Sequence, residues 1–418
     1  MAAKAILWFR NNLRLNDNRC LHYATVNNIS VLPLYIIDER LDELVISNIP
    51  RCGEKRKAWI LANIVSLQKD LQKLGAELYI NKGNVVTTLL DVIQRTGIST
   101  VFTNYEPGFE EEQDIQKLQQ YTNNKIHVIN DNFLIHPNRA PFTLNQTPLV
   151  FTDFRIQIEK NYKEENFYSD LLPNFICNNS IKSDFVCCSN NESFFEPGEQ
   201  GALNRVHYYL FESKLVSTYK ETRNQLLGTD FSSHFSPWLA LGVLSPQTIL
   251  RYLRNYEKDF GANESTYWLW FELLWRDFFR YQMMKFGKLF FRKTGIRDRK
   301  IDSPQNQLLF KQWINGTTSE PFVNANMIEL KQTGFMSNRG RQNVASYLIH
   351  DLNIDWRWGA AYFEMQLLDY DVSSNWGNWA YIAGVGNDPR PFRKFNIKKQ
   401  QEQYDPECKF TNYWLNNN

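Results

Sequence analysis

Residues 266–287 read TYWLWFELLWRDFFRYQMMKFG, and this stretch predicts a long helix with two different faces. Large apolar side chains recur in it at spacings of three and four, which is the period of a helix stripe. A second row, at a spacing of four, carries charge. Such a row is typical of a solvated helix face, but its apolar neighbours leave open a second interpretation, in which the row faces a polar cavity. The stripe consists of Trp268, Phe271, Trp275 and Phe278, and the charged row of Glu272, Arg276 and Arg280.

The sequence around this helix contains little strand signal. From Ala202 onward, one helical pattern follows another almost to the end of the chain. We therefore predict an all-helical domain over residues 201–418. The clearest helical patterns cover Ala202–Tyr219, Ser245–Tyr256, Tyr267–Phe286, Arg339–Leu352 and Gly359–Leu368.

The first part of the chain has a different organisation. Short β-rich runs alternate with helical patterns, of which Glu54–Leu74 is the clearest. This alternation predicts a Rossmann-like α/β domain over residues 1–130 with a parallel five-stranded sheet, a class that binds ligands beyond the carboxyl ends of its strands. Residues 131–200 are rich in Asn, Ser, Pro and Glu, and predict a connector between the domains. The predicted strands are Ile6–Phe9, Val31–Ile37, Glu77–Ile80, Thr100–Thr103 and Lys125–Ile129.

Composition limits the classes of function. The net charge is only +2, so a nucleic-acid site would need a local basic patch. The six cysteines form no CxxC pair, and we expect no metal site. The opening run MAAKAILWFR is too short for a signal peptide, and no stretch approaches the length of a membrane span. We expect a soluble, cytoplasmic monomer.

Polar residues form clusters within the aromatic helical half. Asn338, Arg339 and Arg341 stand at a predicted helix start, which suits an anion, although a solvated turn capped by Asn is a plainer alternative. Asp369 and Asp371 are carboxylates in an aromatic context, where a buried charge needs a partner such as Arg341. Together, these clusters indicate one large ligand with polar edges.

Two further polar features lie in the same half. Asn375 supplies an amide, which both donates and accepts hydrogen bonds. Ser232, Ser233 and Ser236 lie in a loop before a helix, where hydroxyl groups cradle a phosphate or simply cap the helix.

Longer motifs enclose these clusters and follow one another in a fixed order, which is more specific than any short pattern. They are TYKETRN (218–224), FSPWLALGVLSP (235–246), FELLWRDFFR (271–280), GFMSNRGRQNVASYL (334–348) and LLDYDVSSNWGNWAYIAGVGNDPR (367–390).

This series of motifs resembles the photolyase/cryptochrome superfamily, and within it the cryptochrome-DASH branch. The likeness runs from Trp8-Phe9-Arg10 to the C-terminus and weakens only between about residues 130 and 201. It implies an α/β domain followed by an all-α domain that holds FAD in a U-shaped conformation. The residues that it implies for the FAD site are Tyr219, Ser232, Ser233, Ser236, Arg276, Asp277, Asn338, Arg341, Asp369, Asp371 and Asn375.

The resemblance also implies an activity: blue-light-dependent repair of cyclobutane pyrimidine dimers, preferentially in single-stranded DNA, by electron transfer from photoexcited reduced FAD. Glu272 would hydrogen-bond the dimer bases, Trp275 would stack on them, and Asn375 would face the flavin N5. Gln342 and Tyr381 make a more polar wall than duplex-repairing relatives carry, which favours the DASH branch. The implied phosphate contacts are Arg223, Arg339 and Arg393.

Photoreduction in similar proteins runs through three tryptophans. Trp379 and Trp356 match the inner two, but the third position falls on Ser303, which is not readily oxidised. Either Trp313 or Tyr362 replaces it, or photoreduction is weak.

An antenna and a second function complete the expectations. Glu110 matches the acid that binds 5,10-methenyltetrahydrofolate, although an acidic run at 110–112 is also typical of a solvated helix start. The alternative function is a cryptochrome-type blue-light photoreceptor that repairs little.

Overall fold

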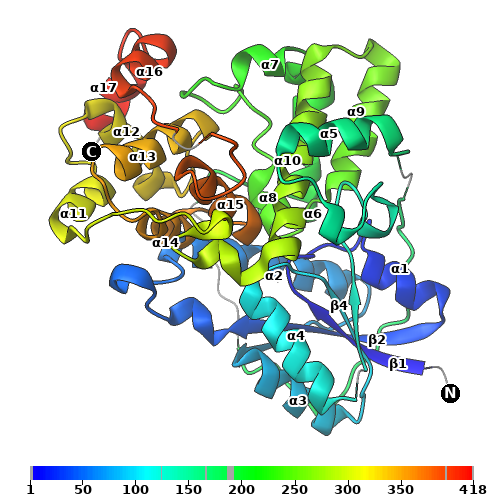
Figure 1. The fold of residues 1–418 in the computed structure, drawn as a ribbon. Coiled ribbons are helices and arrows are strands. Elements are labelled where there is room, and N and C mark those ends of the chain that lie inside the picture. Colours follow the sequence, from blue (N-terminus) through cyan, green and yellow to red (C-terminus); the bar gives the residue numbers. More distant parts are fainter. Residues whose placement is uncertain (1–2, 124, 165–166, 186–192, 391–392, 417–418) are drawn as a thin grey trace.

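A computed structural model of the chain describes residues 3–123, 125–164, 167–185, 193–390 and 393–416. Figure 1 shows an α/β part built from the first third of the chain, with a larger helical part above it. The sheet has five parallel strands in the order β3-β2-β1-β4-β5, which confirms the predicted fold class. The strands are β1 (Ala3–Phe9), β2 (Ile29–Asp38), β3 (Tyr79–Gly83), β4 (Val101–Asn104) and β5 (Ile126–Ile129).

Both faces of the sheet are covered because its central strands are apolar on both sides. In β1, Leu7 and Phe9 pack on one face, and Ile6 and Trp8 pack on the other, as the alternation of a strand requires. The first face receives α1 and α2, and the second receives α3 and α4. These helices are α1 (Arg19–Val26), α2 (Glu54–Lys73), α3 (Val85–Thr96) and α4 (Phe109–Tyr121).

The predicted connector contains a helix that the sequence analysis did not anticipate, α5 (Phe151–Asn161). Its buried residues, Phe151, Phe154 and Ile158, stand three and four apart, so the helical signal was present but short. Phe175, later in the same segment, forms a parallel bridge with Val31 of β2. The connector therefore packs against both parts of the molecule.

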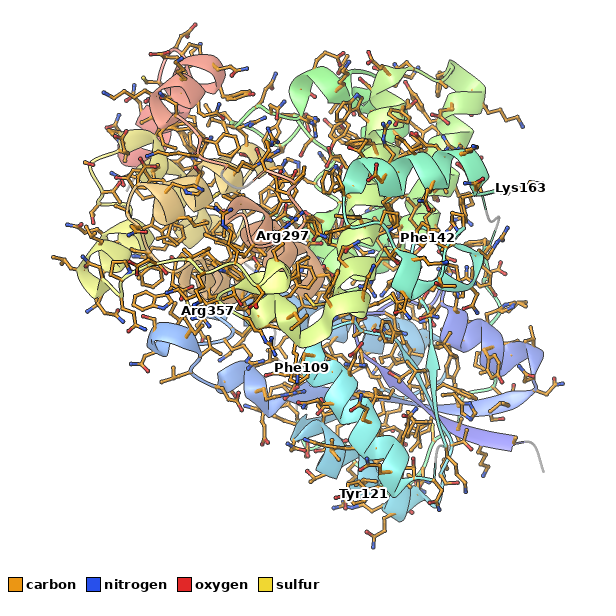
Figure 2. All side chains as sticks on the ribbon, viewed as in Figure 1. Phe109, Tyr121, Phe142, Lys163, Arg297 and Arg357 are labelled. Carbon is orange, nitrogen blue, oxygen red and sulfur yellow. The ribbon has the colours of Figure 1, made fainter. Side chains whose placement is uncertain are left out.

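The remaining helices form the larger part of the molecule, and Figure 2 shows side chains filling the space between them. The long stretch quoted first is α10, which Asn263 caps at its start and which Gly287 ends with a φ of 48°. The described helices are α6 (Gly198–His207), α7 (Tyr219–Thr222), α8 (Ser236–Ala240), α9 (Pro246–Phe260), α10 (Glu264–Phe286), α11 (Gln307–Asn315), α12 (Pro321–Thr333), α13 (Asn338–His350), α14 (Trp356–Gln366), α15 (Val372–Ile382), α16 (Ile397–Tyr404) and α17 (Lys409–Asn416).

The α/β part and the helical part join through a buried arginine just beyond β1. Arg14 donates to the side chains of Asp131 and Asn132 at 2.7 Å each and to the carbonyl of Gly242 at 2.8 Å. Nearby, the backbone N–H of Leu13 donates to the carbonyl of Leu241. The carboxyl edge of the sheet is thus packed against the helical part. None of the described helices has the length and apolarity needed to cross a membrane.

Candidate functional site

A cavity of about 530 Å³ opens among the helices of the larger part. Its walls come from α7, α8, α10, α13 and α15 and from the loops before α8, α13 and α15. The volume lies within the range of about 300–1,000 Å³ that is usual for ligand pockets. Most of the site residues predicted from the sequence line it, namely Tyr219, Arg223, Ser232, Ser233, Ser236, Glu272, Trp275, Arg276, Asn338, Arg341, Gln342, Asp369, Asp371, Asn375, Trp379, Tyr381 and Arg393.

The charged row of α10 faces this cavity and the seam with the α/β part. Glu272 and Arg276 line the cavity, and Arg276 donates to the carbonyl of Asn132 at 2.7 Å. Arg280, one turn further on, is 1% exposed and lies 3.7 Å from Glu106. The solvated interpretation of this row is therefore wrong, and the cavity interpretation is correct.

Two carboxylates on the cavity wall have arginine partners. Arg341 donates to Asp369 at 2.8 Å, as the sequence suggested, and no described residue hydrogen-bonds the second oxygen of Asp369. Asp371 caps α15 by accepting from the backbone of Ser374, and lies 3.6 Å from Arg280. Burial raises the pKa of Asp371, but Arg276 and Arg280 outweigh burial and bring it below its usual value. This carboxylate is ionised at neutral pH.

The serine loop before α8 is held from behind by Arg205, a residue that the sequence analysis missed. Its guanidinium donates to the carbonyls of Thr229, Ser232 and Ser233 at 2.7, 3.0 and 3.0 Å. Because these carbonyls point away toward Arg205, the loop has a fixed shape on the cavity side. Nothing local in the sequence indicates this contact, since Arg205 lies on α6.

His234 is a second wall residue that the sequence analysis missed. It has a φ of 54° and packs its ring against Phe335 at 4.9 Å and Phe231 at 5.0 Å. Burial lowers the pKa of His234 to about 4, so the ring is neutral at physiological pH. The serine loop therefore presents hydroxyl groups and a neutral imidazole to the cavity.

One region of the cavity combines aromatic rings with arginines. The rings of Trp275 and Tyr381 lie 6.0 Å apart, edge to face, and Arg393 lies over Tyr381 at 4.8 Å. Arg339 does not line the cavity but donates to Gln342, which does, at 3.0 Å. Burial lowers the pKa of Arg339, and the nearby charges of Arg223 and Arg393 lower it further. We call Arg223, Arg339 and Arg393 the arginine rim, since their charges act on one another.

Arg223 of this rim forms an ion pair with Glu272. The same guanidinium lies 4.5 Å from the ring of Trp268 on α10. Enclosure by the protein raises the pKa of Glu272, and Arg223 partly offsets that rise. The protonation state of Glu272 therefore depends on its ion pair with Arg223.

Four predicted site residues do not line the cavity, namely Arg339, described above, and Asp277, Trp356 and Glu110. Asn375 does line it, and donates to the carbonyl of Ala360 at 3.0 Å. Asp277 is buried at the seam, where it accepts from the backbone of Ile135 at 2.6 Å. Its assignment to the ligand-binding wall is therefore wrong in this structure. Trp356 is 1% exposed and donates to the carbonyl of Lys293, and Glu110 lies on α4 and pairs with Arg51.

The aromatic residues behind the cavity form contacts in two directions. Trp379, on the wall, has its ring 6.2 Å from Trp313, which lies 5.6 Å from Tyr362. Trp356 lies 5.8 Å from a different ring, that of Trp376. Lys293, whose carbonyl accepts from Trp356, also donates to the carbonyl of Ser303 at 3.4 Å. Trp356 and Ser303 therefore contact the two ends of Lys293, its backbone carbonyl and its ammonium group, and the place of Ser303 in an electron path stays a prediction.

Comparison with known proteins places the chain in a family. Residues 5–173 match a family model described as DNA photolyase, and residues 268–417 match one described as the FAD binding domain of DNA photolyase. The chain is 40% identical to a cryptochrome DASH of Synechocystis sp., over 98% of this chain and 87% of that protein, and 40% identical to one of Xenopus laevis, over 98% and 82%.

Solved structures agree with the sequence relatives. A Synechocystis cryptochrome is similar with a TM-score of 0.93 and 38% identity, covering 100% of this chain and 89% of that one. A bacterial class III photolyase from Agrobacterium tumefaciens is similar with a TM-score of 0.85 and 27% identity, covering 100% and 87%. The chain therefore belongs to the photolyase/cryptochrome family, among the cryptochrome DASH proteins, and contains the FAD-binding domain of that family.

Proposed function

We propose that this protein repairs cyclobutane pyrimidine dimers in single-stranded DNA under blue light. The observation that carries the proposal is the composition of one cavity wall, where Glu272 and Trp275 stand beside the arginine rim. A carboxyl group and an indole suit the edge and the face of a nucleobase, and the rim suits the phosphates on either side of it. Membership of the family supports this substrate, because its model is described as DNA photolyase.

The other walls of the cavity fit FAD. Asp369 keeps one oxygen without a hydrogen-bond partner among the described residues, and the serine loop offers hydroxyl groups to a diphosphate. Arg341 and Asn338 at the start of α13 would hold the polar edge of the flavin, with Asn375 near its ring. When bound, the cofactor would supply light absorption and electron transfer, while the protein supplies position and excludes water.

The substrate residues have separate tasks in this proposal. Trp275 presents its indole for stacking, and Phe151 supports it from behind with a parallel ring at 3.7 Å. Glu272 hydrogen-bonds the base edge, and Gln342 with Tyr381 completes a polar wall. A single-stranded lesion needs less unpairing than a duplex lesion, so a wall with fewer apolar wedges suffices for it.

The folate antenna stays a prediction. Both oxygens of Glu110 already accept hydrogen bonds from Arg51, and Arg40 lies 3.7 Å away. Each oxygen of the carboxylate keeps a second lone pair, so Glu110 can still accept a hydrogen bond from a pterin while it pairs with Arg51. Reconstitution with methenyltetrahydrofolate tests the site: a near-ultraviolet band that Glu110→Gln abolishes would support it, and a band unaffected by this change would place the antenna elsewhere.

Repair is measured by illuminating the reduced flavoprotein with dimer-containing oligothymidine and following the return of thymine absorbance near 260 nm. Repair of the single strand, with slower repair of the same lesion in duplex, is the expected result. Tight binding of the oligonucleotide without repair would instead favour the photoreceptor function.

Two variants separate the roles of the walls. Glu272→Ala removes the group that contacts the base and is expected to lower repair at least tenfold while the flavin absorption is retained. Asp371→Ala removes a carboxylate that balances Arg276 and Arg280, and we expect it to lose flavin. Full flavin occupancy in Asp371→Ala, measured by absorbance per protein, would refute the placement of the cofactor.

A further inference from the structure

Arg223 has charged neighbours of both signs. In the structure it pairs with Glu272, and it also belongs to the arginine rim beside Arg339. In the described part of the chain, Arg223 is the one cation that pairs with Glu272. Among the described residues, Arg339 contacts neutral groups, namely the side-chain amides of Asn224, Gln342 and Gln400 and the ring of Tyr404, so no carboxylate there balances its positive charge.

We propose that a DNA phosphate takes Arg223 away from Glu272, and that Glu272 takes up a proton as the lesion binds. This inference rests on the proposed function and adds a coupling between the phosphate contact and the base contact. A DNA phosphodiester carries one negative charge on two non-bridging oxygens, so it offers a guanidinium the same bidentate contact that a carboxylate does. Even if the guanidinium bridged both anions, the added negative charge would favour the neutral form of Glu272.

The neutral carboxyl group suits the base better than the carboxylate does. A pyrimidine such as thymine presents a carbonyl oxygen beside an N–H group on one edge. An ionised Glu272 can only accept hydrogen bonds, whereas a protonated one donates its O–H to the carbonyl and accepts from the N–H. The proton therefore converts a group that binds arginine into one that reads a base edge.

The groups around Glu272 leave it as the residue that titrates. Tyr219, on α7, is buried, and burial and then the charge of Glu272 raise its pKa well above the usual value, so it stays neutral. Arg276, one turn along α10, is held by the carbonyls of Asn132 and Leu239. Burial already raises the pKa of Glu272 above its usual value, and loss of Arg223 removes the opposing effect.

The sign of the pH dependence follows from this. The pKa of Glu272 is higher in the complex than in the free protein, so binding takes up a proton at any pH between the two values. In that interval, affinity for the lesion weakens by as much as about tenfold for each unit of rising pH. Above the higher value and below the lower one, affinity is independent of this group.

The test is calorimetric titration of the full-length flavoprotein with dimer-containing single-stranded oligothymidine, in buffers of equal pH and different ionisation enthalpy. We expect wild-type protein to take up as much as one proton per complex, and Glu272→Gln to take up none. Arg223→Gln should bind more weakly and take up fewer protons, since loss of Arg223 already raises the pKa of Glu272 in the free protein. Lys220→Gln is the matched control, because Lys220 pairs with Glu264 at the surface and not with Glu272.

The outcomes are distinguishable. Circular dichroism and flavin absorbance check that each variant folds. Lesion binding without proton uptake by wild type, or equal uptake by wild type and Glu272→Gln, would overturn the exchange and leave the proposed function standing. Failure of the wild-type protein to bind the lesion at all would overturn the proposed function itself.

Discussion

Asp277 shows how a buried charge acts on stability away from the cavity. One oxygen accepts from the backbone of Ile135 at 2.6 Å, and the other has no hydrogen-bond partner among the described residues. Arg276 is 3.9 Å away, at the limit of an ion pair. Burial raises the pKa of Asp277 to about 6, so the carboxylate is ionised at neutral pH against the cost of desolvation.

We therefore expect the free energy of unfolding of Asp277→Asn, relative to that of the wild-type protein, to be higher at neutral pH than at acid pH. Because the folded-state pKa is the higher one, the contribution of Asp277 is complete below pH 4 and is lost as pH rises through about 6. A pKa difference of about two corresponds to about 3 kcal/mol. Chemical denaturation measures this effect: the free energy of unfolding of the variant minus that of the wild-type protein should be larger at pH 7.5 than at pH 4.5. An equal difference between variant and wild type at both pH values would contradict the raised pKa of Asp277.

The site was predictable from the sequence wherever a residue belonged to a long motif, and the exceptions have geometric reasons. Asp277 follows Arg276 directly, but consecutive helix residues point about 100° apart, so one faces the cavity and the other the seam. Arg205 is invisible to sequence because its partners are backbone carbonyls of a distant loop.

Two glycines allow α15 to pack closely against α14 and α10. A Cβ on Gly359 of α14 would lie 2.2 Å from the ring of Trp379 on α15, and a Cβ on Gly377 of α15 would lie 2.3 Å from Phe279 on α10. Both distances are too short for side chains fixed in a packed interior. Both neighbouring rings, Trp379 and Phe279, line the cavity.

Gly359→Ala and Gly377→Ala should each destabilise the fold by about 1–3 kcal/mol, since overpacking shifts neighbouring elements. Because both neighbouring rings line the cavity, each variant should also lower flavin occupancy, and Gly359→Ala should in addition change the fluorescence of Trp379. Thermal unfolding, flavin absorbance and tryptophan fluorescence measure these effects. Full flavin occupancy in both variants would contradict a role of the two rings in the ligand-binding wall.

Elements with a long hydrophobic period were predicted with small errors at their ends. The helix expected at Glu54–Leu74 is Glu54–Lys73, and the strand expected at Ile6–Phe9 is Ala3–Phe9. The pattern at Ala202–Tyr219 was interpreted as one helix, but the structure breaks it after His207, where a short π-helical turn follows. Hydrophobic periodicity does not distinguish this change of helix type, because residues on both sides of it are buried in the same core.

At the scale of the whole molecule, one hydrophobic core crosses from the sheet into the helical part. It contains Phe9 of β1 and Trp59 of α2 together with Trp238 of α8 and Phe278 of α10. Because these side chains belong to one continuous cluster, we expect the two parts to unfold together rather than in separate steps.

Arg14→Met tests this joint. The variant leaves Asp131 buried without its ion pair and removes the donor to Gly242, so we expect a loss of about 3–5 kcal/mol. Far-ultraviolet dichroism and tryptophan fluorescence should follow one transition in wild type, at a lower denaturant midpoint in the variant. Two separated transitions in wild type would contradict a shared core.

The contacts that join the two parts of the molecule also affect where the sheet can bind a ligand. Parallel sheets of this class usually leave the carboxyl ends of their strands open to a small molecule. Here Leu13 and Arg14, just beyond β1, are bonded to Leu241 and Gly242 of the helical part. The helical part therefore covers this edge beyond β1, so a small molecule bound there by the first third of the chain would have to lie beyond another strand.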